Sequence, residues 1–95
     1  MDEPLTVGTD TTLRWASGVR YRRDETRDRW MIVAPERILV PEGPGADIAR
    51  LIDGDRSVDD IVELLADEYD APRQTIAEET MAFLQQLADQ RYVVS

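Results

Sequence analysis

The sequence predicts an α+β fold in which a three-stranded antiparallel meander precedes three helices. Two observations predict it. Before residue 41, apolar side chains alternate with polar ones or form short runs between turn residues, a pattern typical of strands. After residue 43, apolar residues recur every three or four positions behind Pro and Ser residues that suit helix starts. Strands that come before the helices, rather than alternating with them, are typical of α+β domains.

The composition limits the chain to one small domain and excludes several kinds of site. It has 95 residues, a net charge of −9, no Cys and no His. Disulfides, thiolate nucleophiles and the usual zinc ligand sets are therefore excluded. No stretch is apolar over the length of a membrane span, and the start lacks a signal-peptide pattern. We expect a cytoplasmic protein that has no cofactor and does not contact a membrane.

The first sixteen residues differ from the rest. The segment "MDEPLTVGTDTTLRWA" has no sustained hydrophobic period and is rich in Thr and Asp. We interpret residues 1–16 as a flexible tail or linker and residues 17–95 as the folded domain.

The meander is predicted from three short segments. In "GVRYRRD", Val19, Tyr21 and Arg23 face one side and the residues between them the other, as in a strand with one solvated face. The polar connection "DETRD" leads to "RWMIVA", which is apolar on both faces, and "APE" reverses the chain into "RILV". Pro41 ends this last strand. The expected strands are residues 18–24, 29–34 and 37–40.

The helices are predicted from their start signals and periodicity. Pro44 suits a first helical turn, and Ser57 begins "SVDD", a capping box with Asp60 as its acidic partner. Pro72 opens the longest helix, which we place at residues 72–90. Its apolar positions cover more than one stripe, so this helix is expected to contact more than the core.

Strands followed by two short helices and a long one are similar to a winged helix-turn-helix whose wing comes first. Such a fold suggests a DNA-binding regulator as an alternative function. However, residues 41–95 hold four Arg and thirteen acidic residues, so the helical half would repel phosphate groups. We therefore expect no nucleic acid partner. A small hydrolase that uses carboxylates is a third alternative, but no oriented base or oxyanion site supports it.

The sequence does not show directly what packs against the third strand or pairs with it. The first and third strands of a meander are both edge strands. Arg residues protect the first strand from unwanted pairing, whereas the third carries only Arg37 and is apolar on both faces. Either the long helix covers this strand and Pro41 blunts its edge, or the edge stays open for an incoming strand and the helix forms the other wall of a groove. The pocket walls expected in the second case are Leu39, Thr80, Phe83 and Leu87.

Residues 18–95 resemble the PqqD family of pyrroloquinoline quinone biosynthesis. The resemblance lies in the strand pair joined by "DETR", the Pro35-Glu36 reversal and the "IARL" helix that ends in Asp53-Gly54. The helix "RSVDDIVELLADEY" and a long last helix follow in the same order. Two positions depart from the family: relatives often carry Asn at the place of Pro41 and Gly near Gln90.

The resemblance implies a peptide chaperone rather than an enzyme. Its partners would be the precursor peptide PqqA, added as a strand to the third strand, and the radical S-adenosylmethionine enzyme PqqE, to which the peptide is presented. PqqC, by fusion or contact, is a further implied partner, and the protein would be a monomer or homodimer. The implied peptide-binding residues are Arg37, Ile38, Leu39, Val40, Pro41, Ile76, Glu79, Thr80, Phe83, Leu84 and Leu87.

Overall fold

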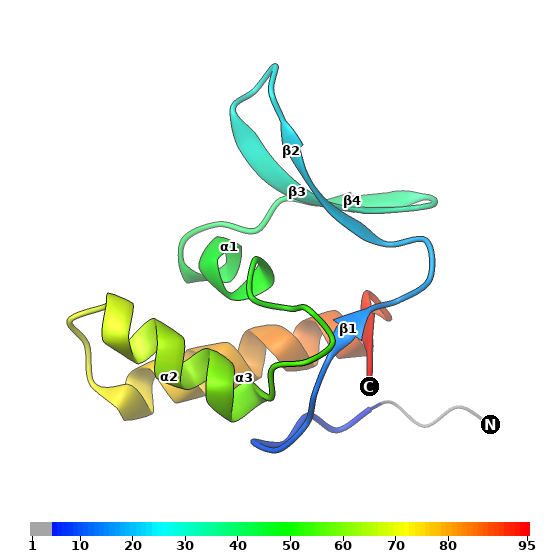
Figure 1. Ribbon diagram of the computed structural model, residues 1–95. Coiled ribbons are helices and arrows are strands. Elements are labelled where there is room, and N and C mark those ends of the chain that lie inside the picture. The colour runs from blue at the N-terminus through cyan, green and yellow to red at the C-terminus, as the bar shows by residue number, and fades with distance from the viewer. Residues whose placement is uncertain (1–4) are drawn as a thin grey trace.

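A computed structural model describes residues 5–95 and confirms the α+β fold (Figure 1). A three-stranded antiparallel sheet lies on one side of three helices, and a separate two-stranded ribbon pairs residues 14–15 with residues 93–94. The elements are β1 (Arg14–Trp15), β2 (Arg20–Asp24), β3 (Arg29–Ala34), β4 (Arg37–Leu39), α1 (Pro44–Ala49), α2 (Val58–Glu68), α3 (Arg73–Asp89) and β5 (Val93–Val94).

The sheet has the predicted meander order, β2-β3-β4. Tyr21 pairs with Ile32 and Ile32 with Leu39, so these three side chains share the face toward the helices. Ile32 at the centre of that face has no exposed surface. Ile38, which pairs with Val33 on the opposite face, is 61% exposed. The apolar residues of β4 are therefore divided between a face toward the core and a face toward solvent.

β4 forms an edge of the sheet. Its only strand partner within the described residues is β3, so the backbone groups on its other side have no ladder partner there. The strand ends at Leu39, and Pro41 just beyond it is buried. The predicted edge strand is thus confirmed, although it ends at Leu39, one residue before the predicted end at residue 40.

Tyr21 connects the sheet to the helices. Its hydroxyl donates a hydrogen bond of 3.0 Å to the carbonyl oxygen of Ala46 in α1. Its ring stacks between Trp15 and Trp30, with centroid distances of 6.0 and 5.1 Å. Burial, and to a smaller extent the nearby Asp47 carboxylate, raises the pKa of the Tyr21 hydroxyl. The phenol therefore remains a hydrogen-bond donor at neutral pH.

The helices begin where the sequence predicts. Pro44 occupies the first turn of α1, although this helix is only six residues long. At the start of α2 both bonds of the predicted capping box are present, from Asp60 N–H to the Ser57 hydroxyl and from Ser57 N–H to the Asp60 carboxylate. The apolar face of α2 packs against α3, and Leu65 and Leu84 lie in the shared core.

Residues 5–16 correct the prediction of a flexible tail. β1 pairs with β5, and backbone N–H groups of Gly54 and Val58 donate to the carbonyl oxygens of Leu13 and Thr11 at 3.0 and 2.8 Å. The side chain of Leu13 is fully buried in the core. The predicted tail also included residues 1–4, which lie outside the described residues. Residues 5–16 are called the arm below. The arm shows no hydrophobic periodicity, because the segments with which it packs are distant in the sequence.

This packing predicts that Leu13→Ala destabilises the protein by about 3 kcal/mol, as for other buried Leu side chains that leave a cavity. Urea denaturation followed by circular dichroism measures the change. Thr6→Ala, at an exposed position of the same arm, serves as the control and should change the free energy of unfolding by less than about 0.5 kcal/mol. Equal, negligible effects of both substitutions would show that the arm is a loose tail.

Candidate functional site

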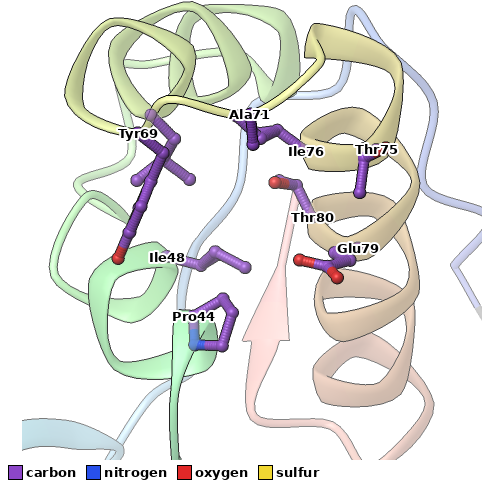
Figure 2. A pocket seen from close by; sticks show the side chains of 9 residues that line it. Pro44, Ile48, Tyr69, Ala71, Thr75, Ile76, Glu79 and Thr80 are labelled. Carbon is purple, nitrogen blue, oxygen red and sulfur yellow. The ribbon is translucent and has the colours of Figure 1, made fainter.

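A pocket lies among the three helices, between α1, the end of α2 and the first half of α3 (Figure 2). Its volume is about 160 Å³, and most of its lining is apolar. The lining residues are Pro44, Ile48, Leu65, Tyr69, Ala71, Thr75, Ile76, Glu79 and Thr80. Because its walls come from three separate segments, the pocket exists only in the folded chain.

A shallower hollow continues from this pocket along α3. The two share Pro44, Ile48 and Glu79, so they form one groove between α1 and α3. The shallow part adds Gly45, Ala82, Phe83 and Gln86 to the lining. Gly45 favours this close approach, since a Cβ atom at this position would lie only 3.0 Å from the Phe83 ring and would displace it.

Two polar groups of α3 reach this groove from adjacent positions. Figure 2 shows the Thr80 hydroxyl and the Glu79 carboxylate pointing into the pocket from the side opposite Tyr69. The Thr80 hydroxyl is buried and has no hydrogen-bond partner in the described chain. The Glu79 side chain is exposed. The pocket thus combines apolar walls with a carboxylate and an unpaired hydroxyl.

Arg37 fixes β4 relative to the end of α3. Its guanidinium Nη2 donates a hydrogen bond of 2.8 Å to the carbonyl oxygen of Gln90. The guanidinium carbon lies 4.3 Å from the centre of the Tyr92 ring, within the range of a cation–π interaction. At the other end of β4, the short segment after Leu39 leads directly to Pro44 of α1. β4 therefore lies between the end of α3 and the start of α1.

The structure brings together only part of the predicted site. Four predicted residues of α3 line the groove: Ile76, Glu79, Thr80 and Phe83. Leu84 and Leu87 do not, because both side chains have no exposed surface and belong to the core. Helical spacing alone does not show which apolar positions of the long helix face the core and which line the groove.

The predicted residues of the third strand have different environments. Arg37 is engaged by Gln90 and Tyr92, and Ile38 faces solvent on the far side of the sheet. Leu39 is partly buried against the core, Val40 is partly buried, and Pro41 is buried. A ligand that binds this segment would therefore contact mainly the backbone at the strand edge.

Sequence reasoning missed the wall that α1 and the end of α2 supply. The sequence predicts Pro44 only as a helix start, and neither Ile48 nor Tyr69 is among the predicted site residues. The residue in the sequence that could have indicated this wall is Gly45, because Gly within a helix often marks close packing of another element.

The charges around α3 do not favour DNA binding. Arg73, the only basic residue of this helix, is paired with Asp59 and Glu63, both at 3.0 Å. A recognition helix needs free basic or amide side chains on its exposed face.

Residues 5–95 contain neither a membrane-spanning helix nor a cluster of metal ligands. No helix in this range is long and apolar enough to cross a membrane. Within the same range, no group of three or more carboxylates is arranged to hold a metal ion.

Comparisons with known proteins identify close relatives of the chain. The family described as Coenzyme PQQ synthesis protein D (PqqD) matches residues 29–93. A PqqA binding protein of Gluconobacter oxydans is 42% identical, and the alignment covers 93% of this chain and 92% of that protein. Another, from Rhodopseudomonas palustris, is 46% identical, with 78% of this chain and 72% of that protein covered.

Solved structures show the same fold. The PqqD part of Methylobacterium extorquens PqqCD, described as a functional and stand-alone recognition element for ribosomally synthesized, post-translationally modified peptides, has a TM-score of 0.81 and 30% identity. The match covers 99% of this chain and 100% of that one. TbiB1 in complex with the TbiA(beta) leader peptide is 18% identical, with a TM-score of 0.72 and coverage of 84% and 93%, and thus shares the fold.

The role of Arg37 can be tested by substitution. Arg37→Met keeps the apolar stem but removes the donors and the cation, and it should lower the free energy of unfolding by about 1 kcal/mol. Arg37→Lys should restore less than half of this, because an ammonium cannot hydrogen-bond and stack in the same way. Urea denaturation and the ring-proton shifts of Tyr92 measure both effects. Unchanged stability and unchanged Tyr92 shifts in Arg37→Met would contradict this role.

Proposed function

The chain belongs to the PqqD family, and on that basis we propose that it binds the PqqA precursor peptide by strand addition at β4 and presents it to the radical S-adenosylmethionine enzyme PqqE. The family consists of non-catalytic peptide-recognition proteins, and the chain is not an enzyme. Precursor-peptide binding is supported by the two PqqA binding proteins that align over most of the chain.

The observation that carries the proposal is the open edge of β4. The connection from β3 has two residues, so the pair that closes it, Ala34 and Arg37, exchanges hydrogen bonds across the hairpin. The next pair of residues, which includes Ile38, does not exchange hydrogen bonds. The N–H and C=O of Ile38 therefore point away from β3. These groups are available to an added strand, and the α1–α3 groove is available to its side chains.

Backbone pairing alone does not give a stable complex. Four or five strand hydrogen bonds contribute roughly 1 kcal/mol each, whereas association costs on the order of 4–15 kcal/mol. Side chains that enter the groove must supply the difference. The apolar lining along Ile48, Ile76 and Phe83 is suited to this, since burial of a large apolar side chain contributes about 1.5–3 kcal/mol.

Presentation to a second protein requires that the two partners use different surfaces. In the proposed arrangement the peptide occupies the β4 edge and the α1–α3 groove, and the opposite face of the sheet stays free (Figure 1). We further propose contact with PqqC, as a separate protein or a fused domain, since the similar Methylobacterium extorquens domain is part of PqqCD.

Titration with synthetic PqqA should locate the site directly. In ¹H–¹⁵N spectra we expect saturable shifts for the amides of residues 37–40 and for the groove-lining positions of α3, because these contact the added strand and its side chains. Shifts confined to β2, the Arg-rich edge on the other side of the sheet, would contradict the proposed site.

Strand addition predicts different effects of two substitutions at one position. Ile38→Pro removes the outward N–H of β4 and should weaken PqqA binding at least about tenfold, while Ile38→Thr keeps the N–H and should change it less than about threefold. Isothermal titration calorimetry measures the affinities, and circular dichroism checks that both variants are folded. Equal losses would mean that the Ile38 side chain, rather than the strand edge, makes the contact.

A further inference from the structure

The pocket at the deep end of the groove has features that apolar packing does not explain. We propose that it binds a primary ammonium group carried on an apolar stem, which is the chemistry of a lysine side chain of the bound peptide. This inference rests on the proposed function and names the side chain that the same groove selects.

The first observation is the Thr80 hydroxyl. Only 1% of the Thr80 surface is exposed, and the hydroxyl oxygen has no hydrogen-bond partner among the described residues. A buried polar group without a partner destabilises the folded state, and native proteins contain few of them. Because the hydroxyl points into the pocket (Figure 2), an occupant can supply the missing hydrogen bond.

The second observation is the charge next to this hydroxyl. Glu79, the preceding residue of α3, directs its carboxylate into the same pocket and makes no ion pair or hydrogen bond within residues 5–95. A carboxylate only accepts hydrogen bonds, so it favours an occupant with donors and repels one with a carboxylate. The net charge of −9 strengthens this preference for a cation.

Tyr69 forms the wall of the pocket opposite Glu79 and Thr80. Figure 2 shows its ring edge-on, with the ring face directed across the pocket toward Glu79 and Thr80. The face of an aromatic ring attracts a cation that lies close to it. An ammonium group has three donors, so one group can bond to the Thr80 hydroxyl and the Glu79 carboxylate together, whereas a phenol has only one donor.

The remaining walls fit the stem of such a side chain. Pro44, Ile48 and Ile76 give an apolar lining along which four methylene groups can lie while the ammonium stays near the exposed Glu79. The volume of about 160 Å³ admits one side chain of this size. A cavity of about 150 Å³ is known to hold a benzene ring, so size alone does not exclude an aromatic occupant. The polar groups decide between them.

The first experiment uses small probes instead of the peptide. Methyl shifts of Ile48 and Ile76 are followed in ¹H–¹³C spectra during titration with n-butylammonium, 1-pentanol and p-cresol at constant ionic strength. We expect saturable binding of n-butylammonium that is at least about tenfold tighter than that of the two neutral probes. Equal or tighter binding of either neutral probe, or no saturable shift, would overturn the assignment.

Substitutions test the assigned groups. Glu79→Gln and Thr80→Val should each weaken n-butylammonium binding at least about fivefold, and Glu78→Gln, which removes a carboxylate at an exposed position of α3 outside the lining, should leave it unchanged. Thr80→Val should also raise the melting temperature, because it removes an unpaired buried hydroxyl, so lost binding cannot be attributed to unfolding. Unchanged binding in both Glu79→Gln and Thr80→Val would refute the proposal.

A competition experiment separates this inference from the proposed function. PqqA that binds should displace n-butylammonium from the pocket methyl groups. If the probe binds and PqqA does not, the proposed function fails while the pocket assignment stands. If PqqA binds without displacing the probe, or binds while the probe does not, the assignment of this pocket to a peptide side chain is refuted and the proposed function stands.

Discussion

The arrangement of the molecule depends on the position of β4 relative to the helices, and Arg37 and Tyr21 fix that position. Arg37 joins β4 to the end of α3 through the Gln90 carbonyl and the Tyr92 ring. Tyr21 joins the sheet to α1 through Ala46. A three-stranded sheet with one solvated face has little apolar surface with which to hold its place. Specific polar contacts from two strands therefore set the distance between the sheet edge and the groove.

The described arm also shapes the site, although it lies outside the groove. β1 pairs with β5 directly after α3, and Thr11 and Leu13 accept hydrogen bonds from the segment that leads into α2. In a domain of this size the core alone stabilises the fold only marginally. Each element that closes the core makes the relative placement of α1, α2 and α3 better defined. The walls of the pocket come from these three helices.

The strand edge and the groove contribute differently to the proposed binding site. The free backbone of β4 has the same hydrogen-bonding groups whatever its side chains are, so an edge of this kind can pair with many sequences. Selectivity must come from the groove, where shape and the placement of Glu79 and Thr80 distinguish one side chain from another. The unpaired hydroxyl of Thr80 lowers stability in the free protein, as is common at binding sites.

The sequence by itself determined the strands, the helix starts, the α+β class and the family, because alternation, capping residues and turn residues are local signals. The capping box at Ser57 and the edge at β4 are examples. Tertiary structure alone decided which apolar residues of α3 face the core and which face the groove, and that residues 5–16 pack on the domain. Such assignments depend on which distant segments become neighbours, and a single sequence contains no local pattern for that.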